Sequence, residues 1–214
     1  MQCSILGDVV RHYFKYQIST FNQPLLTQNN TYGSLTDFAV YREHSGGSFE
    51  GKDAWGAFAT ETGYTSGYYT GNYGNEYSTT LYLYMSTPKP TIITGYSLYI
   101  PTVDSAMHGG SVSNTTFSAS NDQQNWIELN STGGLSQDTQ LSFSFNNSNT
   151  YRYYRFTYKT VGSGRRDYSA VSSFRLIGNE KTVVSGTEDD YDFYTDRIEG
   201  KHIKLNDKYY AVKG

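Results

Sequence analysis

The stretch "YRYYRFTYK", residues 151–159, alternates between bulky and more polar side chains at every second position. In an extended chain, one face carries Tyr154, Phe156 and Tyr158, and the opposite face carries Tyr153, Arg155 and Thr157. Apolar side chains at every second position, with polar ones between them, are typical of antiparallel sheets that cover a core on one side and face solvent on the other. The stretch therefore predicts a strand that has one face on a hydrophobic core.

Similar short stretches recur along the chain, with turn residues between them. They are residues 79–85, 93–100, 115–120, 139–146 and 171–178. The 21 glycines suit tight turns, and the aromatic residues, 16% of the chain, favour strands. No segment keeps a helical period for long, which argues against long helices. We predict an all-β fold in which antiparallel sheets pack as a sandwich or barrel.

Charge and composition exclude several classes of protein. The formal net charge is −3, which argues against nucleic-acid binding through clustered Lys and Arg. No run of eighteen apolar residues predicts a membrane span. The opening "MQCSILGDVVRHYF" lacks the pattern of a signal peptide. The single cysteine, Cys3, excludes an internal disulfide and a cysteine-based zinc site.

Shifts in composition predict three parts of the chain. Residues 1–30 contain a candidate strand and a polar, proline-containing stretch, and we expect a docking extension there. Residues 31–180 hold the recurring strands of the sandwich. Residues 181–214 are expected to form an acidic linker and then a hairpin around Asn206–Asp207. An isolated hairpin is marginally stable, so it needs a surface on which to dock.

Five segments, taken in order, resemble the discoidin, or coagulation factor 5/8 type C, domain and the carbohydrate-binding modules of family 32. They are "DAWGAFAT" (53–60), "YSTTLYLYMSTPKPTIITGYSLYI" (77–100), "FSASNDQQNWIEL" (117–129), "FSFNNSNTYRYYRFTYKT" (143–160) and "YSAVSSFRLIG" (168–178). The resemblance covers about residues 31–180. It implies a galactose-binding-like jelly-roll β-sandwich with short N- and C-terminal extensions.

The sequence departs from this family where many of its bacterial members hold a structural calcium ion. The family's "DG" reads Ala59–Thr60 here, and its glutamate before the closing strand reads Ser172–Ser173. Calcium needs several oxygen ligands, carboxylates among them. We therefore expect no metal or other cofactor, although Glu61 is an alternative calcium ligand.

The resemblance implies that a ligand binds in loops at one end of the sandwich, here 41–52, 68–76, 101–112 and 161–168. These loops combine glycine and serine with aromatic and charged residues, a composition that suits sugar rings and hydroxyls. The candidate ligand-binding residues are Tyr168, Arg165, Arg166, Asp167, His44, Glu43, Tyr73 and His108. The alternative is that the charged ones are solvated loop tips and the tyrosines are sandwich surface.

The two tryptophans are expected to be structural. "SNDQQNWIEL" (120–129) raises the question of whether Trp126 is a sugar-stacking platform or an anchor beside a turn. The resemblance implies that Trp126 starts a strand after a turn at Asn121–Asp122 and is packed there. We expect Trp55 to lie in the core with Phe58.

No motif for catalysis is visible, so we expect a binding protein rather than an enzyme. The tyrosine-rich acidic stretch and short hairpin at the C-terminal end resemble, more loosely, the ends of phage tail and baseplate proteins. We therefore expect adhesion to a host surface glycan by a virion component, bound to other virion proteins or in a homo-oligomer through residues 1–23 and 181–214. The alternatives are a purely structural virion decoration protein and an accessory module of a secreted bacterial enzyme.

Overall fold

The structure is a computed structural model, and its described residues are 13–45, 53–59, 68–73, 80–101, 111–135, 139–161, 166–186, 192–196, 200–205 and 208–211. The chain divides into two compact units. Residues 19–181 form one unit, and residues 1–18 together with 182–214 form the other.

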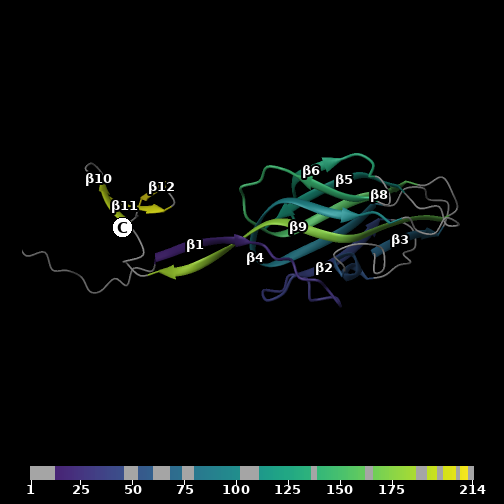
Figure 1. Cartoon of the computed structure of the whole chain (residues 1–214), viewed down its shortest axis with the longest axis horizontal. Coiled ribbons are helices and arrows are strands. Elements are labelled where there is room, and N and C mark those ends of the chain that lie inside the picture. The colour runs from purple at the N-terminus through teal and green to yellow at the C-terminus, as the bar shows by residue number, and fades with distance from the viewer. Residues whose placement is uncertain are drawn as a thin grey trace, which may run out of the picture. The chain divides into compact units, whose positions relative to one another are not determined.

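The larger unit is built from antiparallel strands (Figure 1). One layer follows the pairing order β2 (Ala39–Ser45), the first half of β4 (Thr80–Tyr99), β8 (Tyr151–Val161), β5 (Ser111–Ser120) and β6 (Ile127–Thr132). The other layer contains β7 (Gln140–Ser144), the second half of β4, β9 (Arg166–Gly186) and β3 (Tyr68–Tyr73). Strand β1 (Tyr13–Thr20) pairs with β9, and residues 13–18 of β1 belong to the smaller unit.

Strand β4 belongs to both layers because it changes partners midway. Its residues 80–86 pair with β2 and β8, whereas residues 91–99 pair with β7 and β9. The register shifts between Ser86 and Thr91, where Pro88 and Pro90 cannot donate ladder hydrogen bonds. The long strand thus carries the chain from one sheet to the other.

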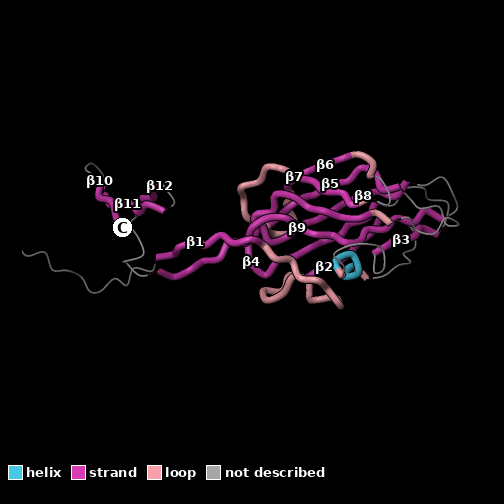
Figure 2. Tube along the Cα trace, in the orientation of Figure 1, coloured by secondary structure: helices cyan, strands magenta, loops and turns pink. Residues whose placement is uncertain are grey.

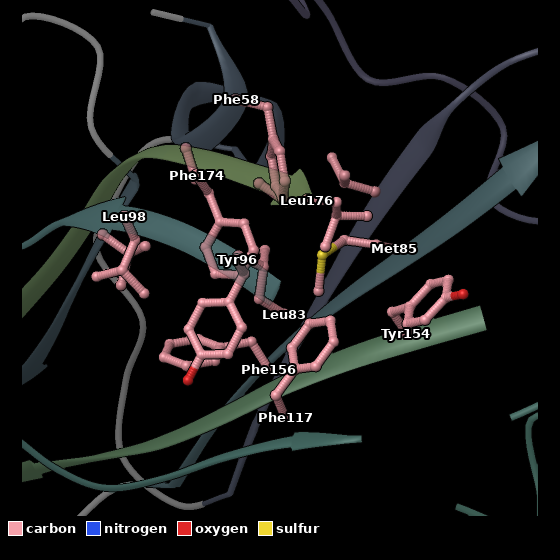
Figure 3. Close-up of a cluster of buried hydrophobic side chains, with 14 of the residues drawn as sticks. Phe58, Leu83, Met85, Tyr96, Leu98, Phe117, Tyr154, Phe156, Phe174 and Leu176 are labelled. Carbon is pink, nitrogen blue, oxygen red and sulfur yellow. The ribbon is translucent and has the colours of Figure 1, made fainter. Parts of the chain in front are cut away.

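The core lies between the two layers and is rich in aromatic side chains (Figure 3). Tyr96 lies near its centre, stacked on Phe174 with ring centroids 5.6 Å apart and tilted against Phe117 at 4.8 Å. Phe156 contacts both Tyr96 and Phe174, at 5.6 and 5.3 Å. These contacts join β4 and β9 of one layer to β5 and β8 of the other, which confirms the predicted sandwich.

A short 3-10 turn, η1 (Ala54–Phe58), is the helical segment of the described chain and lies beside β2 (Figure 2). Phe58 is fully buried, as the sequence predicts, while Trp55 is half-buried and packs against the edge of the core. The backbone of Leu26 donates a hydrogen bond of 3.2 Å to the Phe58 carbonyl. Since Leu26 and Phe21 are also buried, residues 21–30 pack with the sandwich, although the sequence predicts an extension there.

The smaller unit contains a three-stranded antiparallel sheet of β10 (Asp192–Asp196), β11 (Gly200–Leu205) and β12 (Lys208–Ala211). The pairing of Leu205 with Lys208 makes β11 and β12 a hairpin, as the sequence predicts around Asn206–Asp207. The preceding stretch differs from the expected linker, because β9 continues to Gly186 and β10 forms within the acidic segment.

Candidate ligand-binding site

Several strand ends meet at one end of the sandwich. In the first layer, Ser45 at the end of β2 lies opposite Thr80, and Thr80 lies opposite Lys159. On the other side of β8, Ser111 at the start of β5 lies opposite Val161. The connections that follow Ser45 and Val161 and those that precede Thr80 and Ser111 therefore all leave from this end of the layer.

The pairing of β3 with β9 belongs to the same end, because short connections tie it there. Six residues separate Tyr73 from Thr80, and four separate Val161 from Arg166. Since an extended chain spans at most about 3.5 Å per residue, the first connection reaches no farther than about 25 Å and the second no farther than about 18 Å. We call this region the loop end.

The structure brings four of the predicted ligand-binding residues onto this one pair of strands. Tyr73 lies opposite Arg166, Asp167 lies opposite Asn72, and Tyr168 lies opposite Gly71. Their backbones form a β-ladder, so these positions are fixed by strand pairing. The sequence predicts them in loops 68–76 and 161–168, and this is wrong for residues 68–73 and 166–168.

The remaining predicted residues fall elsewhere. Glu43 and His44 lie in β2, opposite Tyr82 and Leu81, although the sequence places them in loop 41–52. Their backbone groups pair with those of β4, so the strand continues to Ser45. Arg165 and His108 lie outside the described residues.

Glu43 faces the outer surface of the first layer, where its carboxylate accepts a hydrogen bond of 3.0 Å from the Tyr84 hydroxyl. Burial raises the pKa of Tyr84, and the hydrogen bond to Glu43 raises it further. The described structure thus ties Glu43 to a tyrosine on the outside of the sheet.

The outer surface of β2, β4 and β8 carries a cluster of aromatic rings around an arginine, which we call the outer aromatic face. Its members are Tyr32, Tyr41, Tyr82, Tyr84, Tyr153, Trp126 and Arg155. Adjacent rings lie 5.7 to 6.2 Å apart between centroids. The sequence alone predicts no functional role for any of these tyrosines. The sequence does show that Tyr82, Tyr84 and Tyr153 occupy the positions of alternating strands that face away from the core.

Trp126 belongs to this face. Its indole nitrogen donates a hydrogen bond of 3.1 Å to the Gln123 carbonyl, and its ring lies 4.5 Å from the Arg155 guanidinium carbon. The side chain is half-buried, and Trp126 stands immediately before β6. It is packed, as predicted, but against an arginine on the outside of the sheet rather than in the core.

The turn before Trp126 is held by one carboxylate. Asp122 Oδ1 accepts hydrogen bonds from the backbone N–H groups of Asn125, at 2.8 Å, and Gln124, at 2.9 Å. Its other oxygen accepts from the Asn125 amide at 2.7 Å. These bonds, that of the Asn125 backbone foremost, lower the pKa of Asp122 well below its ordinary value. The predicted turn at Asn121–Asp122 is confirmed. It fixes the position of Trp126, which follows directly after it.

Within the described part of the chain, no three His, Cys, Asp or Glu side chains come together as metal ligands. Ser172 and Ser173, which stand where the resembled family has its glutamate, are buried. None of the described helices is long and apolar enough to span a membrane.

Comparisons with solved structures give the fold. Module CBM32-3, a carbohydrate-binding module of a family 31 glycoside hydrolase from Clostridium perfringens, is similar with a TM-score of 0.50 and 15% identity, over 65% of this chain and 90% of that one. Chitosan-binding module 1 of a chitosanase/glucanase from Paenibacillus sp. IK-5 has a TM-score of 0.48 and 19% identity, over 68% and 98%. The C-terminal domain of a chitobiase from Bacteroides fragilis has 0.41 and 20%, over 71% and 97%.

No protein-family model matches the sequence, and none of the curated proteins matches it. The likeness to solved structures therefore speaks for the fold alone. The larger unit of the chain has the galactose-binding-like β-sandwich fold, as its sequence predicts.

Proposed function

We propose that the sandwich is a non-catalytic module that binds carbohydrate at the loop end. The observation that carries this proposal is the pairing of β3 with β9. It sets Tyr73 opposite Arg166 and holds Tyr168 two residues farther along the same strand. The fold is one that a carbohydrate-binding module of family 32 also adopts, and this supports the same class of ligand.

The proposed roles follow from the chemistry of these residue types. Tyr168 and Tyr73 offer rings for stacking on the apolar side of a pyranose. Arg165, Arg166 and Asp167 offer hydrogen bonds to hydroxyl groups, and a planar guanidinium pairs well with two adjacent oxygens. His108, His44 and Glu43 are further candidates in the same proposal. Glu43 is the weakest of these because Tyr84 already engages its carboxylate.

A glycan array on the full-length chain tests this function, with multivalent display to raise the effective concentration of weak sites. We expect the wild type to bind a defined group of glycans. Tyr168→Ala and Arg165→Ala should each weaken that binding by roughly tenfold, as loss of a central contact does. Lys89→Gln is a matched control, since Lys89 lies on an exposed position of β4 and pairs at 4.0 Å with Glu180. Unchanged binding in both loop-end variants would defeat the site, and absence of any glycan binding would defeat the function.

The biological setting is a finer proposal. We propose that the module belongs to a phage tail, fibre or baseplate and adheres to a host surface glycan, with residues 1–23 and 181–214 contacting other virion proteins or further copies of the chain. The support is the sequence of the C-terminal part and the small sheet of β10 to β12 that it forms. An accessory module of a secreted enzyme is the alternative, and it fits the glycoside hydrolase that carries module CBM32-3.

Truncation separates these roles. A chain of residues 19–181, the larger compact unit, keeps the strands of the loop end. If the ends serve assembly, this chain should still bind glycan but lose self-association in sedimentation experiments. If the protein is only a structural component of a virion, neither the full chain nor the truncated one should bind any glycan.

A further inference from the structure

The outer aromatic face covers one part of the outer surface of its sheet. Across one register row, Tyr41 lies opposite Tyr84, Tyr84 opposite Arg155, Arg155 opposite Ser118, and Ser118 opposite Glu128. On β5 and β6 the row continues with polar side chains, the buried Ser118 and the exposed Glu128. On β2 and β4 the row has the aromatic rings of Tyr41 and Tyr84, and on β8 it has Arg155.

The exposed rings of this face have the chemistry that a sugar chain needs. Tyr41 is 47% exposed, and Tyr82, Tyr84 and Trp126 are all half-buried. Tyr and Trp present both a flat apolar ring and a polar group. Tyr, Trp and Arg are also enriched at protein interfaces, so a second copy of the chain is the rival occupant that the test has to separate from a sugar. A chain of sugar rings needs flat aromatic surface and hydrogen-bonding groups together, and both are present.

This face carries the cation Arg155 among its rings and the carboxylate Glu43, hydrogen-bonded to Tyr84. The Arg155 guanidinium carbon lies 4.5 Å from the Trp126 ring centroid, 5.7 Å from that of Tyr82 and 6.0 Å from that of Tyr84. Among the described residues Arg155 forms no ion pair, and its Nε is buried without a hydrogen-bond partner. The carboxylate of Glu43 instead accepts from the Tyr84 hydroxyl. A cation held among rings and lacking a carboxylate partner complements an anionic ligand.

We propose that the outer aromatic face is a second carbohydrate site, which takes a sugar chain that bears carboxylate groups. Sugar rings stack on Tyr41, Tyr84 and Trp126, and a carboxylate pairs with Arg155. The planar guanidinium suits a carboxylate because two parallel hydrogen bonds can form. The site lies on the outer surface of β2, β4 and β8 and does not depend on the function proposed for the loop end.

Affinity electrophoresis of the full-length chain tests this site, with native gels that contain polygalacturonate, hydroxyethyl cellulose or dextran sulfate. We expect polygalacturonate to retard the wild type and neutral hydroxyethyl cellulose to leave it unretarded. Retardation by dextran sulfate alone would reject the carboxylate class. Equal retardation by the neutral polymer would reject an acidic ligand, and no retardation by any polymer would overturn the site.

Variants locate the binding. Trp126→Ala and Arg155→Gln should each weaken polygalacturonate binding by roughly tenfold, the loss typical of a central contact. Tyr41→Ala should weaken it by a few-fold, and it is the safest variant for folding because the ring is about half exposed. Thermal unfolding of each variant checks that the sandwich remains folded.

Two controls separate this proposal from its rivals. Lys89→Gln removes one positive charge away from the face and should leave binding unchanged, so an equal loss there would indicate nonspecific attraction of charge. Tyr168→Ala should also bind polygalacturonate normally. If Tyr168→Ala abolishes this binding while Tyr41→Ala does not, the loop end is the only site. Concentration-dependent dimers that Tyr41→Ala dissociates would assign the face to a second copy of the chain and overturn the proposal.

Discussion

Both faces of strands β4 and β8 carry tyrosines, yet the two faces differ in their surroundings. On the inner face, Leu83, Tyr154 and Phe156 are fully buried. On the outer face, Tyr84 and Arg155 are half-buried and lie against Trp126, which follows a turn outside the sheet. Aromatic content alone therefore does not define the core of this protein.

The stability of the fold and the binding of a ligand should depend on different rings. Rings that are closed in on all sides contribute mainly to the free energy of folding. Rings that keep one exposed part have surface left for a ligand, and their contribution to folding is correspondingly smaller. We therefore expect substitutions on the two faces to affect different measurements.

The largest effect should come from the inner face. Phe156→Ala removes a fully buried ring that contacts Tyr96 and Phe174, and should lower the free energy of unfolding by about 3–5 kcal/mol. Its neighbour Thr157 faces outward, and Thr157→Ala should change that free energy by about 0.5 kcal/mol or less. Urea denaturation of both variants checks the contrast, and similar losses would contradict the assignment of the two faces.

The close approach of β4 and β9 should be the next most sensitive feature. A Cβ atom at Gly178 would collide with the backbone of Ile92 and Ile93. Gly178→Ala should therefore cost about 1–3 kcal/mol, as overpacking does. At Gly133, by contrast, a Cβ atom meets nothing within 4 Å. Thermal unfolding should give Gly133→Ala a near wild-type midpoint, and an equal drop in both variants would argue against this register.

Hydroxyl groups give a smaller contrast between the faces. The Tyr154 hydroxyl is buried and donates to the Thr91 carbonyl at 2.8 Å, so Tyr154→Phe should cost about 1 kcal/mol. Tyr84→Phe loses an exposed hydrogen bond to Glu43, and should cost about 0.5 kcal/mol or less. Chemical denaturation under identical conditions measures both. A larger cost for Tyr84→Phe would mean that the outer face is more closed than described.

The smallest effect concerns the acid side of the stability curve. Hydrogen bonds from the Asn125 and Gln124 backbone hold the pKa of Asp122 below its ordinary value of 3.8. The stabilisation is thus present above that value and is lost as the pH falls through the lower folded-state pKa. Asp122→Asn should flatten this acid-induced loss. Urea midpoints measured at a series of pH values below neutrality check it, and parallel curves for variant and wild type would count against the turn as drawn.

The sequence predicts the sandwich well, because alternation in stretches such as 151–159 depends on local geometry that the fold keeps. It does not predict the residues at which the strands end. "YYTGNYGNE" is rich in turn residues, yet Tyr68–Tyr73 pairs with β9, since a partner strand satisfies the backbone of even a glycine-containing segment. Strand length is therefore set by the partner and is invisible in the local pattern.

The candidate sites show a similar division. The turn around Asp122 is predictable from its residues. The face of the sheet that Trp126 covers depends on its contact with Arg155, some thirty positions along the chain. Tyr32 meets Tyr84 and Tyr153 in the same way, from a segment that the sequence assigns to the boundary of an extension. Contacts between distant segments, which need the tertiary fold, create the outer aromatic face.

The most direct test of carbohydrate binding by this sandwich is nuclear magnetic resonance of the isotopically labelled full-length chain, titrated with an oligosaccharide selected on the array. We predict saturable shifts of the backbone amide signals of Tyr73 and of residues 166–168. Titration with an oligogalacturonate should add shifts at Tyr41, Tyr84 and Trp126. Unchanged signals at both the loop end and the outer aromatic face, with every selected ligand, would contradict the account.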